Sequence, residues 1–172
     1  MTFAFRPLAA ALLLAATVTA AHAVQPLVQH DIVLLQKGEL IEQRVDGGAD
    51  AMSAYLKTLG AALTDTMRAN PAQLPTAGFV VVALRPDNKT HTWFDFKPRL
   101  ADATMAALAQ TVAATPTMPI KQGDIVFALR VSVWSDKPPQ AYAPAPQEWK
   151  DATKDMRPKP DVDTLVDMVW PR

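Results

Sequence analysis

Residues 78–96 read GFVVVALRPDNKTHTWFDF, and this stretch decides the fold that we expect for the chain. Residues 79–85 form a nearly continuous apolar run, which is typical of a strand that is buried on both faces. Residues 86–89 are turn-forming, and residues 90–96 return with alternating side chains. The stretch therefore predicts a β-hairpin whose second strand has an apolar face and a more polar face that carries Trp93.

Two helices and a further strand are predicted around this hairpin. Residues 50–69 carry apolar side chains at helical spacing, which favours an amphipathic helix. Residues 99–114 repeat that spacing, and residues 125–134 predict a long strand whose odd-numbered side chains belong to the core. These elements predict an α+β fold in which a small antiparallel sheet is packed by two main helices.

The residues before the first helix predict a second hairpin. Residues 32–35 are apolar and β-prone, residues 37–39 resemble a turn, and residues 40–45 can return as a strand. We expect residues 24–29, which precede this hairpin, to be loosely held.

The last third of the chain has a different character. Residues 137–146 contain four prolines, which predicts an extended linker with polyproline tendency. Two short stretches with apolar side chains at helical spacing follow, one around Trp149 and one around Leu165. We therefore assign a single α+β domain to residues 24–136, and to residues 137–172 a linker and short amphipathic helices that dock on the domain or on a partner.

The first 23 residues are typical of a cleavable secretory signal peptide. Arg6 provides a positive start, residues 8–21 are apolar, and Ala21 and Ala23 are the small residues that signal peptidase requires. The apolar run is shorter than the roughly 20 residues that a membrane-spanning helix needs. We expect cleavage after Ala23 and a periplasmic or secreted protein with no later transmembrane segment; an uncleaved anchor is the alternative.

The composition argues against several classes of function. The chain has no cysteine, which excludes disulfides, thiol catalysis and Cys-ligated zinc. Its 17 basic and 17 acidic residues balance, so it lacks the positive charge that binding of nucleic acid requires. We therefore expect no nucleic-acid partner.

The sequence also lacks a recognisable catalytic or metal-binding pattern. His30 and His91 are the only histidines after the predicted cleavage site, and their separation matches no metal motif. Ser53, Ser132 and Ser135 lie outside any nucleophile-elbow context. We accordingly assign no catalytic residue, no metal ligand and no cofactor.

A candidate interaction surface comes from the polar sides of the two predicted strands at 90–96 and 125–134. It consists of His91, Trp93, Arg130 and Trp134. Tryptophans in such positions are typical anchors of protein–protein interfaces. The preferred alternative is that the C-terminal helices cover both tryptophans.

Residues 78–134 resemble the C-terminal domain of TonB-type energy transducers. The resemblance lies in the Gly-x-Val-x-Val strand that starts at Gly78, the Pro86-Asp87 turn, the helix and the final long strand. It implies a small ββαβ unit that pairs its strands with partners. The Ser-Ser-Gly-like segment of that family is replaced here by residues 94–98, and its membrane anchor is missing if the signal peptide is cleaved.

These observations favour a non-enzymatic envelope protein that binds another envelope protein. The first alternative is an inhibitor or immunity-type protein that acts on an exported enzyme. A hydrolase with an unrecognised site, which would use His30 or His91, is the least favoured interpretation.

Overall fold

The protein is represented by a computed structural model that describes residues 24–70 and 74–171. The predicted signal peptide, residues 1–23, lies outside the described residues. The elements follow in the order β1 (Leu27–Leu34), α1 (Gly38–Arg44), α2 (Gly48–Ala69), β2 (Thr76–Leu84), β3 (Thr90–Lys97), α3 (Asp102–Ala114), β4 (Ile125–Val133), α4 (Gln147–Thr153) and α5 (Val162–Val169).

The four strands form one antiparallel sheet in the order β1-β4-β2-β3. β2 pairs with β3, with Val80 opposite Phe94, which confirms the predicted hairpin. β2 also pairs with β4, with Val80 opposite Leu129, so these two strands form the centre of the sheet. β1 and β3 are its edges, and the α+β class expected from the sequence is confirmed.

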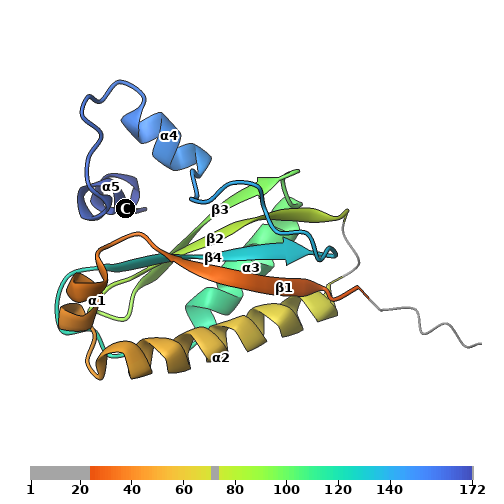
Figure 1. Ribbon diagram of the computed structural model, residues 1–172, viewed down its shortest axis with the longest axis horizontal. Coiled ribbons are helices and arrows are strands. Elements are labelled where there is room, and N and C mark those ends of the chain that lie inside the picture. Colours follow the sequence, from red (N-terminus) through yellow and green to blue (C-terminus); the bar gives the residue numbers. More distant parts are fainter. Residues whose placement is uncertain (1–23, 71–73, 172) are drawn as a thin grey trace, which may run out of the picture.

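Helices cover both faces of this sheet (Figure 1). α2 and α3 pack on one face, where a core forms around side chains such as Val82, Leu129 and Leu59. α4 and α5 lie over the other face, where a second core forms around Phe79 and Val126. Each central strand contributes side chains to both cores. Nearly all of its positions are therefore apolar, on either face of the sheet.

The predicted helix at 50–69 is observed as α2. Its apolar stripe is buried throughout, and consists of Met52, Tyr55, Leu56, Leu59, Leu63 and Met67. The helix begins two residues earlier than predicted because Gly47 adopts a left-handed φ of 81° that turns the chain into it. Asn70 follows its last turn, and the Asn70 side-chain amide donates a hydrogen bond to the Thr66 carbonyl oxygen.

The predicted N-terminal hairpin is wrong. Residues 40–45 belong mainly to helix α1, because Ile41 and Val45 are four residues apart and both are buried, which is helical spacing. The strand before them starts at Leu27 and pairs with β4, so residues 27–29, half of the stretch expected to be loosely held, belong to the sheet. β4 offers a mostly apolar strand of nine residues as a partner, whereas a local hairpin would have left that edge of β4 uncovered.

The close approach of β2 to β3 at Gly78 generates a test of the fold. A Cβ added at Gly78 would lie 2.2 Å from the Asp95 carbonyl oxygen and 2.6 Å from the Phe96 Cα. Both are backbone atoms that cannot move without breaking the hairpin. Gly78→Ala should therefore lower the free energy of unfolding by about 2–3 kcal/mol, as overpacking does in well-packed cores, measured by urea denaturation.

Gly38→Ala is the matched control for this substitution. A Cβ at Gly38 meets nothing within 4 Å, and alanine favours helix α1, so this variant should be at least as stable as the unmodified protein. Equal stability of the two variants would contradict the close approach at Gly78.

Candidate functional site

The structure buries one half of the predicted interaction surface under the C-terminal helices. Trp93 is 3% exposed, and its ring centroid lies 5.5 Å from that of Trp149 and 6.5 Å from that of Trp170. His91 is half-buried between Trp93, at 4.5 Å, and Trp170, at 5.8 Å. Burial lowers the pKa of His91, although the charge of Glu148 opposes this effect.

Trp134 lies on the opposite side of the sheet from Trp93. Simple alternation along β4 predicts that it shares a face with Val126, but it packs against the core formed by α2 and α3. The reason is a left-handed φ of 50° at Trp134, which redirects the side chain at the end of the strand. Arg130 is half-buried, forms a salt bridge with Asp31 and donates a hydrogen bond to the Pro139 carbonyl oxygen. The four predicted residues therefore do not form one exposed surface.

Charged groups hold α5 against the rest of the molecule, in an arrangement that we call the C-terminal latch: Arg44, Arg85, Asp124, Asp163 and Asp167. Arg44 forms a salt bridge of 2.6 Å with Asp163 on α5. Arg85 binds both Asp124, at 3.1 Å, and Asp167 on α5, and so joins α5 to the sheet.

The pKa values of Asp163 and Asp124 in the latch are shifted. The hydrogen bond from Arg44 lowers the pKa of Asp163, and one from Gln36 acts in the same direction. Burial raises the pKa of Asp124 against the opposing effect of Arg85. The Arg85 guanidinium also lies 3.8 Å from the centre of the Trp170 ring, so cation–π attraction adds to the ion pairs.

A histidine and a serine that sequence reasoning treated separately meet between β1 and β4. His30 Nε2 lies 2.9 Å from Ser132 Oγ, across 102 residues of sequence. Ser132 is fully buried, and its hydroxyl donates to the Ser135 carbonyl oxygen. The histidine must then donate to Ser132 Oγ, and this polarity is the reverse of the one that activates a nucleophile. The pair stabilises the end of the sheet and does not support a hydrolase.

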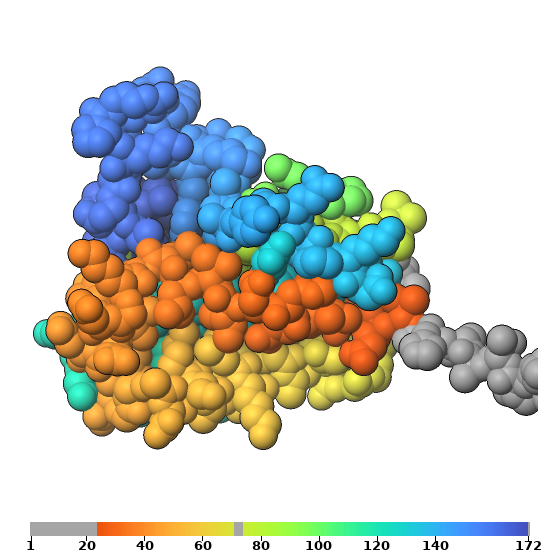
Figure 2. All heavy atoms as spheres, viewed as in Figure 1, coloured from red at the N-terminus to blue at the C-terminus, as the bar shows by residue number. Residues whose placement is uncertain are grey.

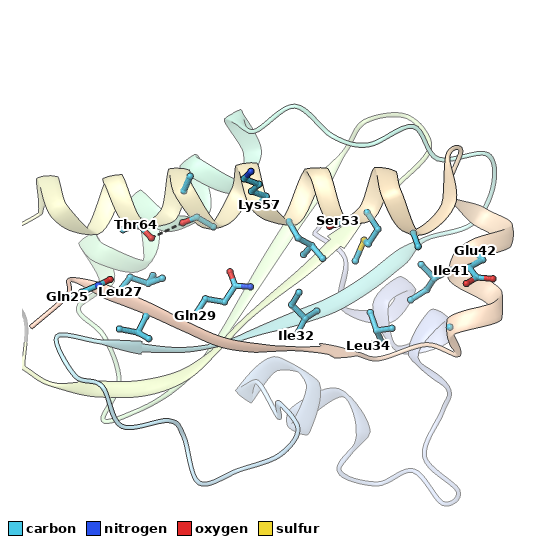
Figure 3. A pocket seen from close by; sticks show the side chains of 17 residues that line it. Gln25, Leu27, Gln29, Ile32, Leu34, Ile41, Glu42, Ser53, Lys57 and Thr64 are labelled. Carbon is cyan, nitrogen blue, oxygen red and sulfur yellow. Dashed lines mark hydrogen bonds between the residues drawn. The ribbon is translucent and has the colours of Figure 1, made fainter.

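The remaining candidate site is a groove of about 890 Å³ between β1 and α2, which we call the β1–α2 groove. Figure 2 shows β1 and α2 side by side on one face of the molecule, and Figure 3 shows the side chains that line the groove. Its apolar lining consists mainly of Leu27, Ile32, Leu34, Ile41, Met52 and Leu56. Leu34 is 48% exposed, so the apolar lining of the groove extends to the surface.

A β-bulge in β1 shapes this groove. The pairing with β4 shifts between Gln29 and Asp31, so that His30 is an extra residue in the strand. Regular alternation would place Asp31 beside Gln29 in the groove, but the bulge shifts the alternation by one position. As a result Ile32 and Leu34 line the groove, and Figure 3 shows Gln29, Ile32 and Leu34 pointing from β1 toward α2.

Sequence reasoning missed this groove because it paired residues 32–35 with residues 40–45. The one signal present in the sequence was Gly60, an unfavourable residue in the middle of a long helix. A Cβ at Gly60 would lie 2.8 Å from Gln29 Oε1, so the glycine makes room for a side chain from β1.

Other kinds of site receive no support from the described residues. Within 24–70 and 74–171, no three His, Asp or Glu side chains are grouped so that they could hold a metal ion. None of the helices in that part of the chain combines the length and apolar character that crossing a membrane requires. Comparisons with protein-family models, curated proteins and solved structures give no match, so the candidate site depends on its own geometry.

The latch generates a prediction about pH dependence. The pKa of Asp163 is lowered in the folded protein, so its carboxylate stabilises the fold above the unfolded-state pKa of about 4. That contribution disappears as the pH falls through the lower folded-state pKa. Asp163→Asn should therefore reduce the free energy of unfolding at pH 7, and the difference from the unmodified protein should shrink below about pH 4, as measured by urea denaturation across this range.

Asp65→Asn is the matched control for the latch. Asp65 forms an ion pair with Arg68 on the exposed surface of α2, where such pairs contribute little. This variant should have the same free energy of unfolding as the unmodified protein at pH 3 and at pH 7. An Asp163→Asn effect of the same size at pH 3 and pH 7 would refute the ionic role of the latch.

Proposed function

We propose that this protein is a periplasmic or secreted interaction module that binds an extended segment of another envelope protein in the β1–α2 groove. The observation that carries the proposal is the combination of an edge strand and an apolar groove. In the part of the chain that the structure describes, β1 pairs only with β4, so its outer edge offers backbone N–H and C=O groups. An extended peptide can add to such an edge as a further strand.

The groove supplies the selectivity that the backbone edge alone lacks. Hydrogen bonds along the edge of a sheet bind peptides of any sequence, whereas pockets for alternate side chains give selectivity. Ile32, Leu34 and Met52 line such a pocket beside the edge. Each aliphatic side chain that a partner buries there contributes about 1.5–3 kcal/mol, before the costs of association.

The other edge of the sheet is a poorer candidate. The groove beside β3 is smaller, at about 580 Å³, and half of the residues that line it are charged: Asp95, Lys97, Arg99, Glu148, Lys150 and Asp151. α4 also lies against this part of the molecule, since Trp149 packs on Trp93. β1 is therefore the edge that combines accessible backbone with an apolar lining.

The sheet faces are poorer candidates than the β1 edge. α2 and α3 cover one face, and the C-terminal helices cover the other. The resemblance to TonB C-terminal domains, although it covers residues 78–134 and not β1, supports strand pairing as the kind of interaction, because it implies strands that pair with partners. β2, β3, α3 and β4 follow one another in the order of the ββαβ unit that the resemblance implies.

Selection from a displayed library of random peptides tests this proposal. The purified protein should enrich peptides with apolar side chains at alternate positions, because alternate side chains of an added strand face the groove. Titration with an enriched peptide should shift the NMR signals of β1 and of the facing side of α2. Enrichment of no common pattern, or signal changes confined to other elements, would overturn the proposal.

Leu34→Glu provides the matching loss of function. It places a charge in the apolar groove and should weaken peptide binding at least about tenfold, which is a loss of about 1.4 kcal/mol. Leu74→Glu is the control, because Leu74 is 81% exposed and does not line the groove. The control should bind as the unmodified protein does; equal binding by both variants would argue against the groove.

The predicted export has a separate test. When the whole chain is expressed in a bacterium, mass spectrometry of the protein recovered from the envelope should show Val24 as its first residue. An intact N-terminus on membrane-bound protein would favour the uncleaved anchor instead.

A further inference from the structure

Gln29 is the polar side chain that extends across the β1–α2 groove. It projects from β1 toward α2 beside the bulge, as Figure 3 shows. Its Oε1 atom reaches the helix at Gly60, where any Cβ would lie only 2.8 Å away. Glycine is a poor residue for the interior of a helix, but at this position it leaves space for the Gln29 side chain.

The Gln29 amide is available to a ligand. Among residues 24–70 and 74–171, no hydrogen bond joins its side chain to another group of the protein, and the residue is exposed. A primary amide carries an acceptor oxygen and two N–H donors. Beside the bulge, where an added strand cannot continue its ladder with β1, the amide can therefore hydrogen-bond a backbone N–H or C=O group of the peptide.

The charges in the groove are few and separated. Glu42 is the only acidic residue that lines it, and Lys57 is the only basic one. Neither forms a salt bridge within the described part of the chain. Figure 3 places Glu42 at the α1 end of the groove, beyond Leu34, so the apolar part of the groove ends at an exposed carboxylate that has no salt-bridge partner among the described residues.

We infer that the groove selects an extended peptide with apolar side chains at alternate positions and a basic residue at the end beside Glu42, and that Gln29 hydrogen-bonds the backbone of this peptide and sets its register. The apolar side chains lie against Ile32 and Leu34, which are two residues apart as alternate strand positions are. The basic side chain then neutralises Glu42. This inference rests on the proposed function, because it names the partner of the same groove.

The charge preference can be tested with synthetic peptides. The probes are peptides of alternating Val and Thr with a Lys at one end, made in both chain directions, and the same peptides with Glu in place of Lys. Because Glu42 is exposed and such charge pairs are weak, we expect one Lys peptide to bind about threefold to fivefold more tightly than its Glu counterpart in a fluorescence titration at low salt. Glu42→Gln should remove most of that preference, whereas equal binding of the Lys and Glu peptides to the unmodified protein would overturn the inference.

The role of Gln29 can be separated from stability by Gly60→Ala. The new Cβ displaces only the flexible end of the Gln29 side chain and improves the helix, so the variant should melt at a higher temperature. It should nevertheless bind the Lys peptide about tenfold more weakly, as should Gln29→Leu, which keeps the side-chain size. Thr58→Ala is the control, because it also improves α2 but lies on its exposed side, outside the groove lining. Its binding should not change.

The outcomes distinguish this inference from the proposed function. If no peptide binds the unmodified protein, or if bound peptide shifts NMR signals away from β1 and α2, both fail. If peptides bind in the groove but Gly60→Ala and Gln29→Leu bind as tightly as the unmodified protein, the proposed function stands and the role of Gln29 is refuted.

Discussion

The structure depends on one constraint: the two central strands are apolar on both faces, so both faces of the sheet must be covered. Phe79 and Val81 point to one side of β2, Val80 and Val82 to the other, and all four are buried. α2 and α3 can cover only one side. The second side would expose a large apolar surface, which soluble proteins avoid. The chain meets this requirement with its own C-terminal segment, which returns across the sheet after the Pro-rich linker and is held by Arg44 and Arg85 (Figure 1).

The same constraint determines which parts of the fold can be predicted from the sequence. The β2–β3 hairpin, α2, α3, β4 and the two C-terminal helices each carry a local pattern, because each must present a defined apolar surface to the sheet. The pairing of β1 with β4 carries no such pattern, since its partners are about a hundred residues apart and the bulge at His30 breaks the alternation. The candidate groove was missed for that reason. Trp134 was assigned to the wrong face of the sheet for a related reason. Its own left-handed φ cancels the alternation on which that assignment depended.

Faces and edges of a sheet pose different problems. An uncovered face would expose many apolar side chains to water, and the lost burial would destabilise the fold. An uncovered edge only leaves backbone groups to hydrogen-bond with water, at little cost to the folded chain. In the proposed interaction module, an edge of the sheet therefore binds the partner while the covered faces stabilise the fold. Of the two edges, β1 is the one where apolar side chains, Leu34 above all, extend the core to the surface.

An open edge also carries a risk, because it can pair with any extended chain, including another copy of itself. The bulge at His30 limits this risk, since a regular strand cannot continue its ladder across an extra residue without losing register. It also keeps Asp31 out of the groove and directs it to Arg130, so the groove remains apolar while a charge stands at the edge. One irregular residue thus makes β1 a poor partner for indiscriminate pairing and gives the groove its apolar lining. A strand that binds there must match the groove as well as the edge, and this is the condition for a selective interaction.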